Sequence, residues 1–373
     1  FKIPNQKKII LLDKFGYHEK YKILPKSETY IIDTQNLRIN LFILLKSFIQ
    51  LKFSKLNYIE TYINHIRPKI LITFLDNNEI FYEISNKFVT KIVVQNGRRL
   101  SKKKNFSPRK KTSDYIFTLS EIDKKFYKNI GVDCKNYITH GSYRCNSQPI
   151  LKEKIKVITD IIYVSTYRKF YKNKKISVYK NITSSEYIKN ELKLIEYISE
   201  FCKKNNKTLS ILMRHPKYTD LSLEEKKFFY KKYKMEKINY IYSQHYEENN
   251  FFDKSKNLNS SYNNLFKAKI VVGIDSTLLY EAFSLGCRVG FFGIRGSKAE
   301  LKYRSFGWPH TFSEKGNFWC NNLNKEEIFN ILNNLFKFKK TQWSYNLKKY
   351  EFIMSKDDGN KKLKKILKKI LIK

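Results

Sequence analysis

The sequence predicts an α/β protein built from two doubly wound, Rossmann-like domains. Short apolar runs rich in β-branched residues alternate with segments of helical periodicity, the pattern of parallel strands joined by helices. Several of these runs end in polar turns, as strands do at the ligand-binding edge of such a sheet. With 373 residues, of which 42% are hydrophobic, the chain can bury two cores of ordinary size.

The first half contains five predicted strands and one clear helical segment. Apolar residues recur at helical spacing over 41–53, which predicts a helix there. A turn-rich stretch from His140 to Pro149 separates the two halves, so we place a first domain at residues 1–149. The expected strands are 8–12, 30–34, 68–75, 91–94 and 115–120.

The second half repeats this alternation, and we place a second domain at residues 150–345. Helices are expected over 191–204 and 223–233, and the chain is helical from Lys325 onward. The remaining segment, 346–373, is predicted to form a basic amphipathic helix. The expected strands of the second domain are 157–164, 208–213, 238–242, 269–273 and 288–292.

The segment from Lys269 to Phe292 predicts a complete strand–turn–helix–strand unit. A buried strand ends at Gly273, and the polar residues Asp275, Ser276 and Thr277 form the turn that caps the helix. Backbone N–H groups, the positive end of the helix dipole and two hydroxyls meet at this turn, which favours an anion. Glu281, one turn further in, can accept hydrogen bonds from ribose hydroxyls. The alternative is an ordinary capped helix without a ligand.

The net charge of +40 favours anionic partners but does not indicate a nucleic-acid-binding protein. Lys residues are spread over the whole chain, together with abundant Asn, Ile, Tyr and Phe, as expected from an AT-rich genome. No nucleic-acid recognition motif is present, so no nucleic-acid partner is expected. Five scattered cysteines without a CxxC pair indicate a reducing compartment and argue against a zinc site.

Two motifs of the second half together resemble a known group of enzymes. Arg214-His215-Pro216 follows a strand, and Asp275-Ser276-Thr277 follows another strand roughly sixty residues later. This pair resembles the His-Pro and Ser/Thr motifs of bacterial sialyltransferases and Kdo (3-deoxy-octulosonate) transferases with the GT-B fold. The phrase from Val272 to Ala282 also looks like that of surface-carbohydrate biosynthesis proteins. The resemblance implies two Rossmann-like domains that face each other across a cleft.

The resemblance also implies roles for individual residues. In those families the His and the hydroxyls contact the phosphate of a CMP-sugar, which assigns His215, Ser276 and Thr277 to the donor. GT-B enzymes need no bound divalent cation, and no DxD motif stands in a metal-binding setting here, so neither metal nor cofactor is expected beside the nucleotide-sugar. The predicted nucleotide-binding residues are Ser165, Arg168, Arg214, His215, Pro216, Gly273, Asp275, Ser276, Thr277 and Glu281.

The catalytic base is less well indicated by the sequence. The sialyltransferases carry an acidic pair before a Gly in the first domain, whereas this chain has Asp76-Asn77-Asn78, with one carboxylate and no Gly. We predict Asp76 as the base, or as the nucleophile of a retaining enzyme, with an Asx turn as the alternative. His215 is the second predicted catalytic residue. The predicted acceptor-binding residues are Asn77, Asn96, Arg98 and His140.

The end of the chain carries apolar residues at helical spacing with Lys between them. Such a helix can lie on an anionic membrane surface or pack back on the protein. We expect contact with the membrane through Lys361–Lys373, because the Lys density exceeds what packing needs. This suits a cytoplasmic enzyme peripheral to the inner face of the bacterial inner membrane.

The sequence therefore predicts a glycosyltransferase of lipopolysaccharide or capsule assembly. Its donor is expected to be a CMP-linked Kdo or sialic-type acid, and its acceptor a glycan or lipid-linked glycan. A CDP-polyol phosphotransferase of the teichoic-acid type is an alternative, as is a UDP-sugar glycosyltransferase. The non-enzymatic alternative is a basic protein that binds nucleic acid or membranes.

Overall fold

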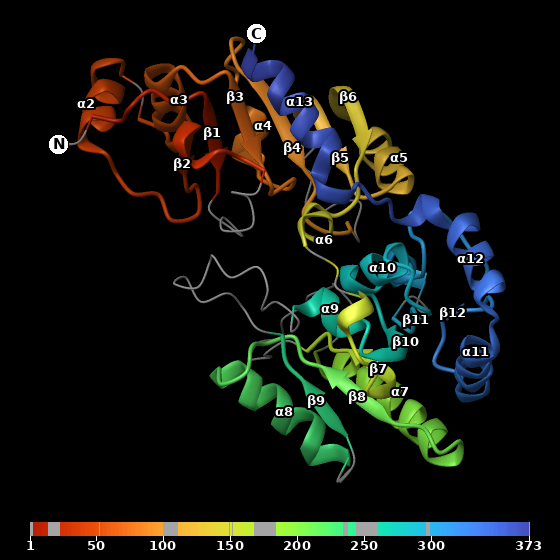
Figure 1. Cartoon of the computed structure of the whole chain (residues 1–373). Coiled ribbons are helices and arrows are strands. Elements are labelled where there is room, and N and C mark those ends of the chain that lie inside the picture. The colour runs from red at the N-terminus through yellow and green to blue at the C-terminus, as the bar shows by residue number, and fades with distance from the viewer. Residues whose placement is uncertain are drawn as a thin grey trace. The chain divides into compact units, whose positions relative to one another are not determined.

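The chain divides into two units in the computed structural model (Figure 1). The first unit comprises residues 1–148 together with 354–373, and the second comprises 149–353. The C-terminal segment therefore belongs to the first unit. The structure describes residues 3–13, 23–51, 53–99, 111–148, 150, 152–167, 184–233, 238–243, 260–295 and 299–372.

The first unit contains a six-stranded parallel sheet with the strand order β2-β1-β3-β4-β5-β6. The chain moves outward from β1 to β2, and then from β3 in the opposite direction, so the switch point of the sheet lies between β1 and β3. Every residue of β1 is fully buried, as expected of a parallel strand covered on both faces. The strands are β1 (Ile9–Leu12), β2 (Thr29–Ile32), β3 (Ile70–Thr73), β4 (Thr90–Val94), β5 (Lys111–Thr118) and β6 (Val132–Thr139).

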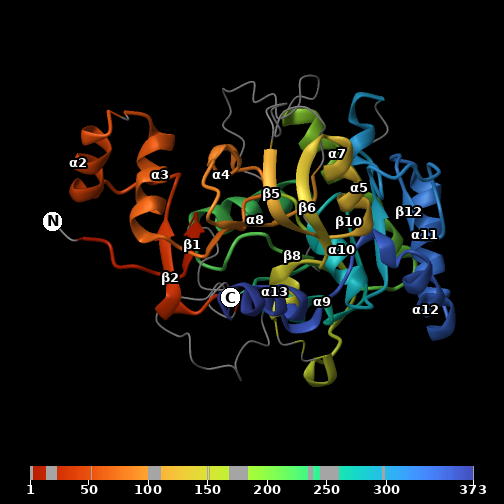
Figure 2. The same ribbon diagram turned by 90° about the horizontal axis from the view of Figure 1, so that it is seen from above.

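Helices cover both faces of this sheet (Figure 2). One core cluster joins Ile10 and Leu12 to residues of α2 (Leu41–Ile49), α3 (Lys55–Ile66), α4 (Glu79–Glu83) and α5 (Glu121–Asn129). The other cluster joins Ile9 and Leu11 to residues of α6 (Tyr143–Ser147) and α13 (Lys361–Ile372). Because successive strand residues point to opposite faces, the alternation along β1 supplies both cores.

The second unit repeats the design with the order β12-β11-β10-β7-β8-β9. Here the direction changes between β7 and β10, which is the switch point of this sheet. The strands are β7 (Thr159–Val164), β8 (Leu209–Leu212), β9 (Asn239–Ile241), β10 (Ala268–Gly273), β11 (Val289–Phe292) and β12 (Trp319–Cys320). The helices are α7 (Ser184–Lys204), α8 (Asp220–Tyr233), α9 (Ser261–Leu265), α10 (Thr277–Ser284), α11 (Lys325–Lys337) and α12 (Lys340–Lys349).

Stacked aromatic rings fill the β10–β12 side of the second core. The rings of Phe306 and Trp319 are stacked with centroids 4.9 Å apart, and Phe283 stacks on Phe318 at 5.7 Å. Trp343 of α12 meets both Phe283 and Phe318 edge-on. These contacts fix α10 and α12 against the short strand β12. Short 3₁₀ turns complete the chain at Lys26–Glu28, Lys152–Lys154, Ala299–Arg304, Glu351–Ile353 and Asp358–Asn360.

Two parallel sheets of this kind confirm the predicted fold class, and each predicted strand has its counterpart. The strand β6 was not predicted, because its residues are mostly half-buried or exposed and form no apolar run. The helix α3 was not predicted either. Its tyrosines, asparagines and histidine interrupt the apolar pattern, although Ser54 caps it by accepting from the N–H of Asn57.

The C-terminal helix α13 packs on the first sheet, and this corrects its predicted use. Leu363 is fully buried and Leu367 is 4% exposed, and Ile366, Ile370 and Leu371 pack partly buried against the same cluster. The apolar face that we expected to contact the membrane is therefore covered by the protein's own sheet. The Lys residues of α13 occupy its outer side.

Several polar contacts attach the C-terminal segment to the first unit. The N–H of Ser355 donates to the carbonyl of Leu119 at 2.9 Å, and the Asn360 side chain donates to the carbonyl of Tyr143 at 3.1 Å. Gly141 has a φ of +83°, and a Cβ there would lie 2.2 Å from the Ser355 carbonyl oxygen. A glycine is therefore required for this close approach.

Shortening Leu363 should destabilise the protein strongly. We expect Leu363→Ala to lower the free energy of unfolding by about 3 kcal/mol, because it leaves a cavity between α13 and the sheet. Ile372→Ala on the same helix is the control, and at 74% exposure it should cost less than about 0.5 kcal/mol. Urea unfolding of both variants measures the difference, and equal losses would contradict the packing described.

Candidate functional site

Three polar turns meet at the edge where the strands of the second sheet end. The central strand β7 leads into Ser165-Thr166-Tyr167, and its neighbours β8 and β10 lead into Arg214-His215-Pro216 and Asp275-Ser276-Thr277. Since strands lie about 4.8 Å apart, β8 and β10 are about 10 Å from each other. The topology thus brings together the two motifs singled out in the sequence. Ligands of open α/β sheets bind at such a switch point.

The side chain of Glu225, on α8, joins the turn after β7 to the turn after β8. This fully buried carboxylate accepts from the Ser165 hydroxyl at 2.5 Å and from the N–H groups of Arg214 at 3.0 Å and His215 at 3.1 Å. Burial raises the pKa of Glu225. The His-Pro turn is therefore held by a residue that sequence analysis missed.

His215 follows β8 at this edge of the sheet. His215 is partly exposed, and its ring meets the ring of Tyr167 edge-on, with centroids 6.2 Å apart. Arg214 is exposed and donates from Nη1 to the carbonyl of Tyr167 at 3.2 Å. Pro216 accepts from the Thr219 hydroxyl at 2.9 Å through its carbonyl. His215 is thus partly open to solvent, while Glu225 fixes its backbone N–H.

Two arginines join the turn after β10 to the turn after β7. The Asp275 carboxylate accepts from Nη1 of Arg295 at 2.8 Å and from Nη1 of Arg304 at 2.7 Å. Arg295 also donates to the Thr166 hydroxyl at 3.1 Å and lies 3.5 Å from Glu191. The Asp275 side chain is only 8% exposed. We predicted that Asp275 binds the nucleotide. In this geometry its carboxylate instead supports the turn.

The start of α10 presents hydroxyls and N–H groups. Ser276 is the N-cap and accepts from the N–H of Leu278 at 3.3 Å. Ser276 and Thr277 are both partly exposed. The N–H groups of Leu278 and Leu279 already donate to Ser276, and the positive end of the helix dipole adds to the attraction for an anion.

Other predicted nucleotide-binding residues serve packing. A Cβ on Gly273 would lie 3.0 Å from a methyl of Leu279 and 3.3 Å from the Val164 carbonyl, so the glycine lets α10 approach β7. Glu281 is 6% exposed and accepts from the Tyr262 hydroxyl at 3.3 Å. The predicted ligand Arg168 lies outside the described residues.

In the first unit, Asp76 follows β3 in the chain and is fully buried. Its carboxylate accepts from Nε of Arg99 at 2.5 Å and from Arg99 Nη2, from the hydroxyl of Tyr127, and from the N–H of Asn96 at 3.2 Å. Burial and then the Asp76 charge raise the pKa of Tyr127 well above its usual value, so this phenol stays a donor. A carboxylate with four donors and no exposed surface is unsuited to deprotonate an acceptor hydroxyl.

The predicted acceptor-binding residues divide into two pairs. Asn77 is exposed and accepts from Arg99 at 3.3 Å, and Asn96 is partly exposed, so both lie around the Asp76–Arg99 pair. Arg98 is 7% exposed, and His140 is fully buried. We therefore withdraw His140 as an acceptor-binding residue, because it has no surface to offer.

His140 instead lies where the C-terminal segment joins the first unit. Its Nδ1 is 3.1 Å from the Gly141 carbonyl oxygen, and its Nε2 is 3.5 Å from an Asp357 carboxylate oxygen. Burial lowers the pKa of His140 to about 4, against the attraction of Asp357. The ring is therefore neutral at physiological pH.

Asp13 is a further buried carboxylate that sequence analysis missed. It follows β1 at the switch point of the first sheet and has a φ of +73°. It accepts from the N–H of Thr34 at 2.9 Å and from the Asn78 side chain at 2.5 Å. A polar residue directly after the apolar run of β1 was the available signal.

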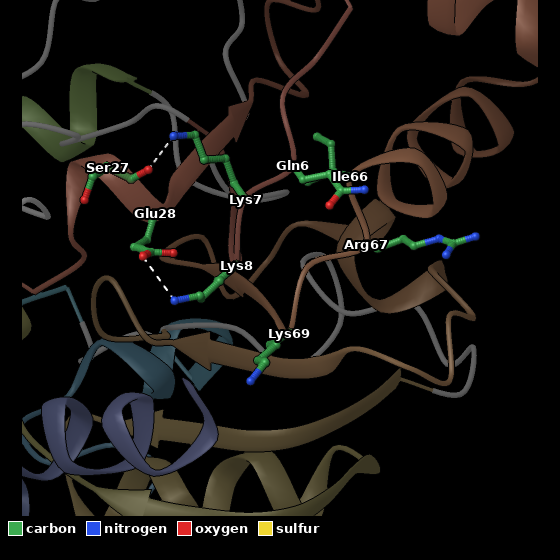
Figure 3. A pocket seen from close by; sticks show the side chains of 8 residues that line it. All are labelled: Gln6, Lys7, Lys8, Ser27, Glu28, Ile66, Arg67 and Lys69. Carbon is green, nitrogen blue, oxygen red and sulfur yellow. Dashed lines mark hydrogen bonds and ion pairs between the residues drawn. The ribbon is translucent and has the colours of Figure 1, made fainter. Parts of the chain in front are cut away.

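A pocket of about 440 Å³ lies at the opposite edge of the first sheet, where the strands begin (Figure 3). Lys7 donates to the carbonyl of Ser27, and Lys8 pairs with Glu28 at 3.2 Å. Arg67 points away from these residues. The pocket is remote from the polar turns of this sheet, so it is not the predicted site. Its lining residues are Gln6, Lys7, Lys8, Ser27, Glu28, Ile66, Arg67 and Lys69.

Two doubly wound units with polar turns at both switch points define a protein of the GT-B fold class. The chain belongs to a family described as "putative O-antigen biosynthesis protein", whose model matches residues 92–371. No curated protein matches the sequence. Among the described residues, no group of three or more His, Cys, Asp or Glu side chains is placed to hold a metal ion.

Solved structures share the fold at low sequence identity. UDP-GlcNAc 2-epimerase from Methanocaldococcus jannaschii has a TM-score of 0.52 and 16% identity, over 97% of this chain and 99% of that chain. The wall teichoic acid polymerase TagF has a TM-score of 0.53 and 12% identity, over 99% and 89%. A glycosyltransferase from Rickettsia africae has a TM-score of 0.51 and 10% identity, over 99% of both chains.

Replacing Asp76 should cost stability. We expect Asp76→Asn to lower the free energy of unfolding by about 3 kcal/mol or more, because Arg99 loses its buried counter-charge. The nearby exposed carboxylate Glu79 provides the control, and Glu79→Gln should change stability by less than about 0.5 kcal/mol. Chemical denaturation measures both. An Asp76→Asn protein as stable as wild type would restore the case for a catalytic base.

His140 should make stability depend on pH. Between about pH 6.5 and pH 4 the unfolded chain binds a proton at His140 that the folded chain does not, so the unfolding free energy falls as pH falls through this window. The loss is at most about 3 kcal/mol. Unfolding measured at intervals of pH should show a shallower dependence in His140→Gln. Parallel curves for the two proteins would contradict this account.

Proposed function

We propose that this protein is a glycosyltransferase that moves a sugar from a nucleotide-sugar to a growing surface glycan, in lipopolysaccharide or capsule. Membership of the O-antigen biosynthesis family and the GT-B fold support the proposal. The observation that carries it is the placement of His215 and the start of α10 on either side of β7, at the switch point of the second sheet.

The donor phosphate binds at the start of α10 in this proposal. The hydroxyls of Ser276 and Thr277 donate to the phosphate oxygens, and the positive end of the α10 dipole adds to the attraction. The Asp275 carboxylate does not repel the phosphate, because Arg295 and Arg304 neutralise it. The same ion pairs hold the turn in one conformation, which reduces the entropy lost on binding.

His215 stabilises the departing nucleotide. When the bond between sugar and phosphate breaks, negative charge builds on the phosphate, and a nearby imidazolium or imidazole N–H lowers the energy of that state. Tyr167 orients the ring by its edge-on contact, and Glu225 holds the backbone N–H of His215. In this proposal, helix, hydroxyls and imidazole supply the stabilisation without a divalent cation.

The donor is a CMP-linked sugar in this proposal, and the acceptor is a glycan or lipid-linked glycan that binds the first unit. The resemblance of the His-Pro and Ser/Thr motifs to CMP-sugar transferases supports the choice of base. Asn77 and Asn96 are the exposed polar groups proposed for the acceptor. The buried Asp76 orders Arg99 beneath them, so we do not propose it as the base.

A nucleotide screen by thermal shift tests the proposal. CMP should raise the melting temperature more than CDP, UDP, GDP or a short oligonucleotide, by an amount equivalent to about 2.7 kcal/mol at a hundredfold excess over Kd. His215→Ala and Ser276→Ala should remove the shift. Ser276→Ala also removes a helix cap, so the matched control is Ser54→Ala, the cap of α3, which should retain the full shift.

The other outcomes of the screen distinguish the alternatives. Preference for UDP would replace the CMP donor by a UDP-sugar, and preference for CDP would favour a polyol phosphotransferase. Stabilisation by the oligonucleotide alone would favour the non-enzymatic interpretation. A CMP shift that survives His215→Ala and Ser276→Ala would mean that the nucleotide binds elsewhere. Activity that EDTA abolishes would contradict metal-independent catalysis.

A further inference from the structure

Helix α2 carries an unusual exposed surface. Among the described residues, sixteen large hydrophobic side chains are exposed, and seven of them lie between Ile39 and Phe53. Ile49 is 83% exposed and Leu51 is 79% exposed. Both views place α2 at the outer margin of the first unit, beside α3 (Figures 1 and 2). We call these seven side chains the α2 patch: Ile39, Leu41, Leu45, Phe48, Ile49, Leu51 and Phe53.

The helical part of the patch lies on one face. Leu41, Leu45 and Phe48 follow at intervals of four and three residues, so they share one side of the helix, and Ile49 flanks them. The opposite side buries Ile43 and Ser47 against the first core. The ring of Phe53 lies 5.6 Å from that of Phe48, which extends the patch beyond the helix. A surface helix normally turns polar residues outward, whereas α2 exposes an apolar face to solvent.

The charges along the segment that carries the patch have one sign, and Asp33 and Glu60 lie just beyond it on either side. The segment from Gln35 to Ile59 contains Arg38, Lys46, Lys52 and Lys55 and no Asp or Glu. Arg38 and Lys55 are exposed, and Lys46 is partly exposed. An apolar helix face bordered by cations is the surface that inserts at the boundary between lipid headgroups and acyl chains of an anionic membrane.

We propose that the α2 patch binds the surface of an anionic phospholipid membrane, with its apolar side chains below the headgroups and its cations on the phosphates. No helix in the described ranges is long and apolar enough to cross a bilayer. A second copy of the chain fits less well, because a symmetric contact would bring Arg38 and Lys46 near the same cations of the other copy.

This surface replaces the one that the sequence indicated. The C-terminal helix α13 lies on the other face of the first sheet, and its apolar residues are already buried there (Figure 2). Membrane binding through α2 uses no residue of the candidate nucleotide site. Its measurement is therefore independent of whether the transferase proposal holds.

Sedimentation of the full chain with lipid vesicles tests the proposal. Wild type should bind vesicles of phosphatidylcholine with about 30% phosphatidylglycerol, and bind pure phosphatidylcholine weakly. The variant Leu45→Gln/Phe48→Gln/Ile49→Gln should bind the anionic vesicles about tenfold more weakly or worse, with an unchanged melting temperature because these side chains are exposed. Arg38→Gln/Lys46→Gln should lose most of the preference for anionic lipid.

Two matched controls separate the patch from general stickiness and general charge. Phe88→Gln/Leu223→Gln/Tyr345→Gln removes three exposed apolar side chains elsewhere, and Lys364→Gln/Lys368→Gln removes two exposed cations of α13. Both should bind vesicles as wild type does. The proposal is overturned if wild type binds no vesicle, if the α2 variant binds unchanged, or if the controls lose as much. If the wild type is a dimer, the α2 variant is a monomer and neither binds vesicles, the patch would be assigned to a second copy.

Discussion

Buried carboxylates hold the loops that follow the strands of both sheets. Asp76 is enclosed by Arg99 and Tyr127, Asp275 lies between Arg295 and Arg304, and Glu225 accepts from two successive N–H groups. A loop leaving a parallel sheet carries backbone donors that no neighbouring strand satisfies. Asp76 and Glu225 supply some of these acceptors, whereas Asp275 pairs with two guanidinium groups. The burial of each carboxylate is tolerable only with those partners in place. The geometry of the loops therefore depends on them.

This arrangement explains why an acidic residue after a strand is an ambiguous signal. Asp76 and Asp275 each stand in a polar turn after an apolar run, as a catalytic or ligand-binding acid would. Their partners are distant in sequence: Arg99 from the loop after β4, and Arg295 and Arg304 from beyond β11. In a chain with 74 basic and 34 acidic residues, a cation is available for almost any turn, so the pattern cannot distinguish a supporting carboxylate from a reactive one.

The fold was predictable where a strand is apolar throughout, and less so elsewhere. The runs at β1, β3, β7 and β10 are buried on both faces and leave no alternative. Most residues of the edge strand β6 are half-buried or exposed, and they form no such run. The positions of His215 and Ser276 directly after strands were also predictable, because each follows an apolar run. Glu225, Glu191 and Arg295 were not, since only the assembled sheet brings them to the turns.

Helices α2 and α13 of the first unit show that sequence predicts the surfaces of a protein only in part. In α13 every apolar residue except the exposed Ile372 lies on one side, so a single sheet face covers them and the cations remain outside. In α2 seven of nine residues are apolar, and one sheet face can cover only one side of a helix. A periodic pattern thus shows that an apolar face exists, whereas its width decides whether the fold alone can cover it. The apolar side chains of the α2 patch are those that the protein's own core does not cover, and they are the ones that we propose to bind the membrane.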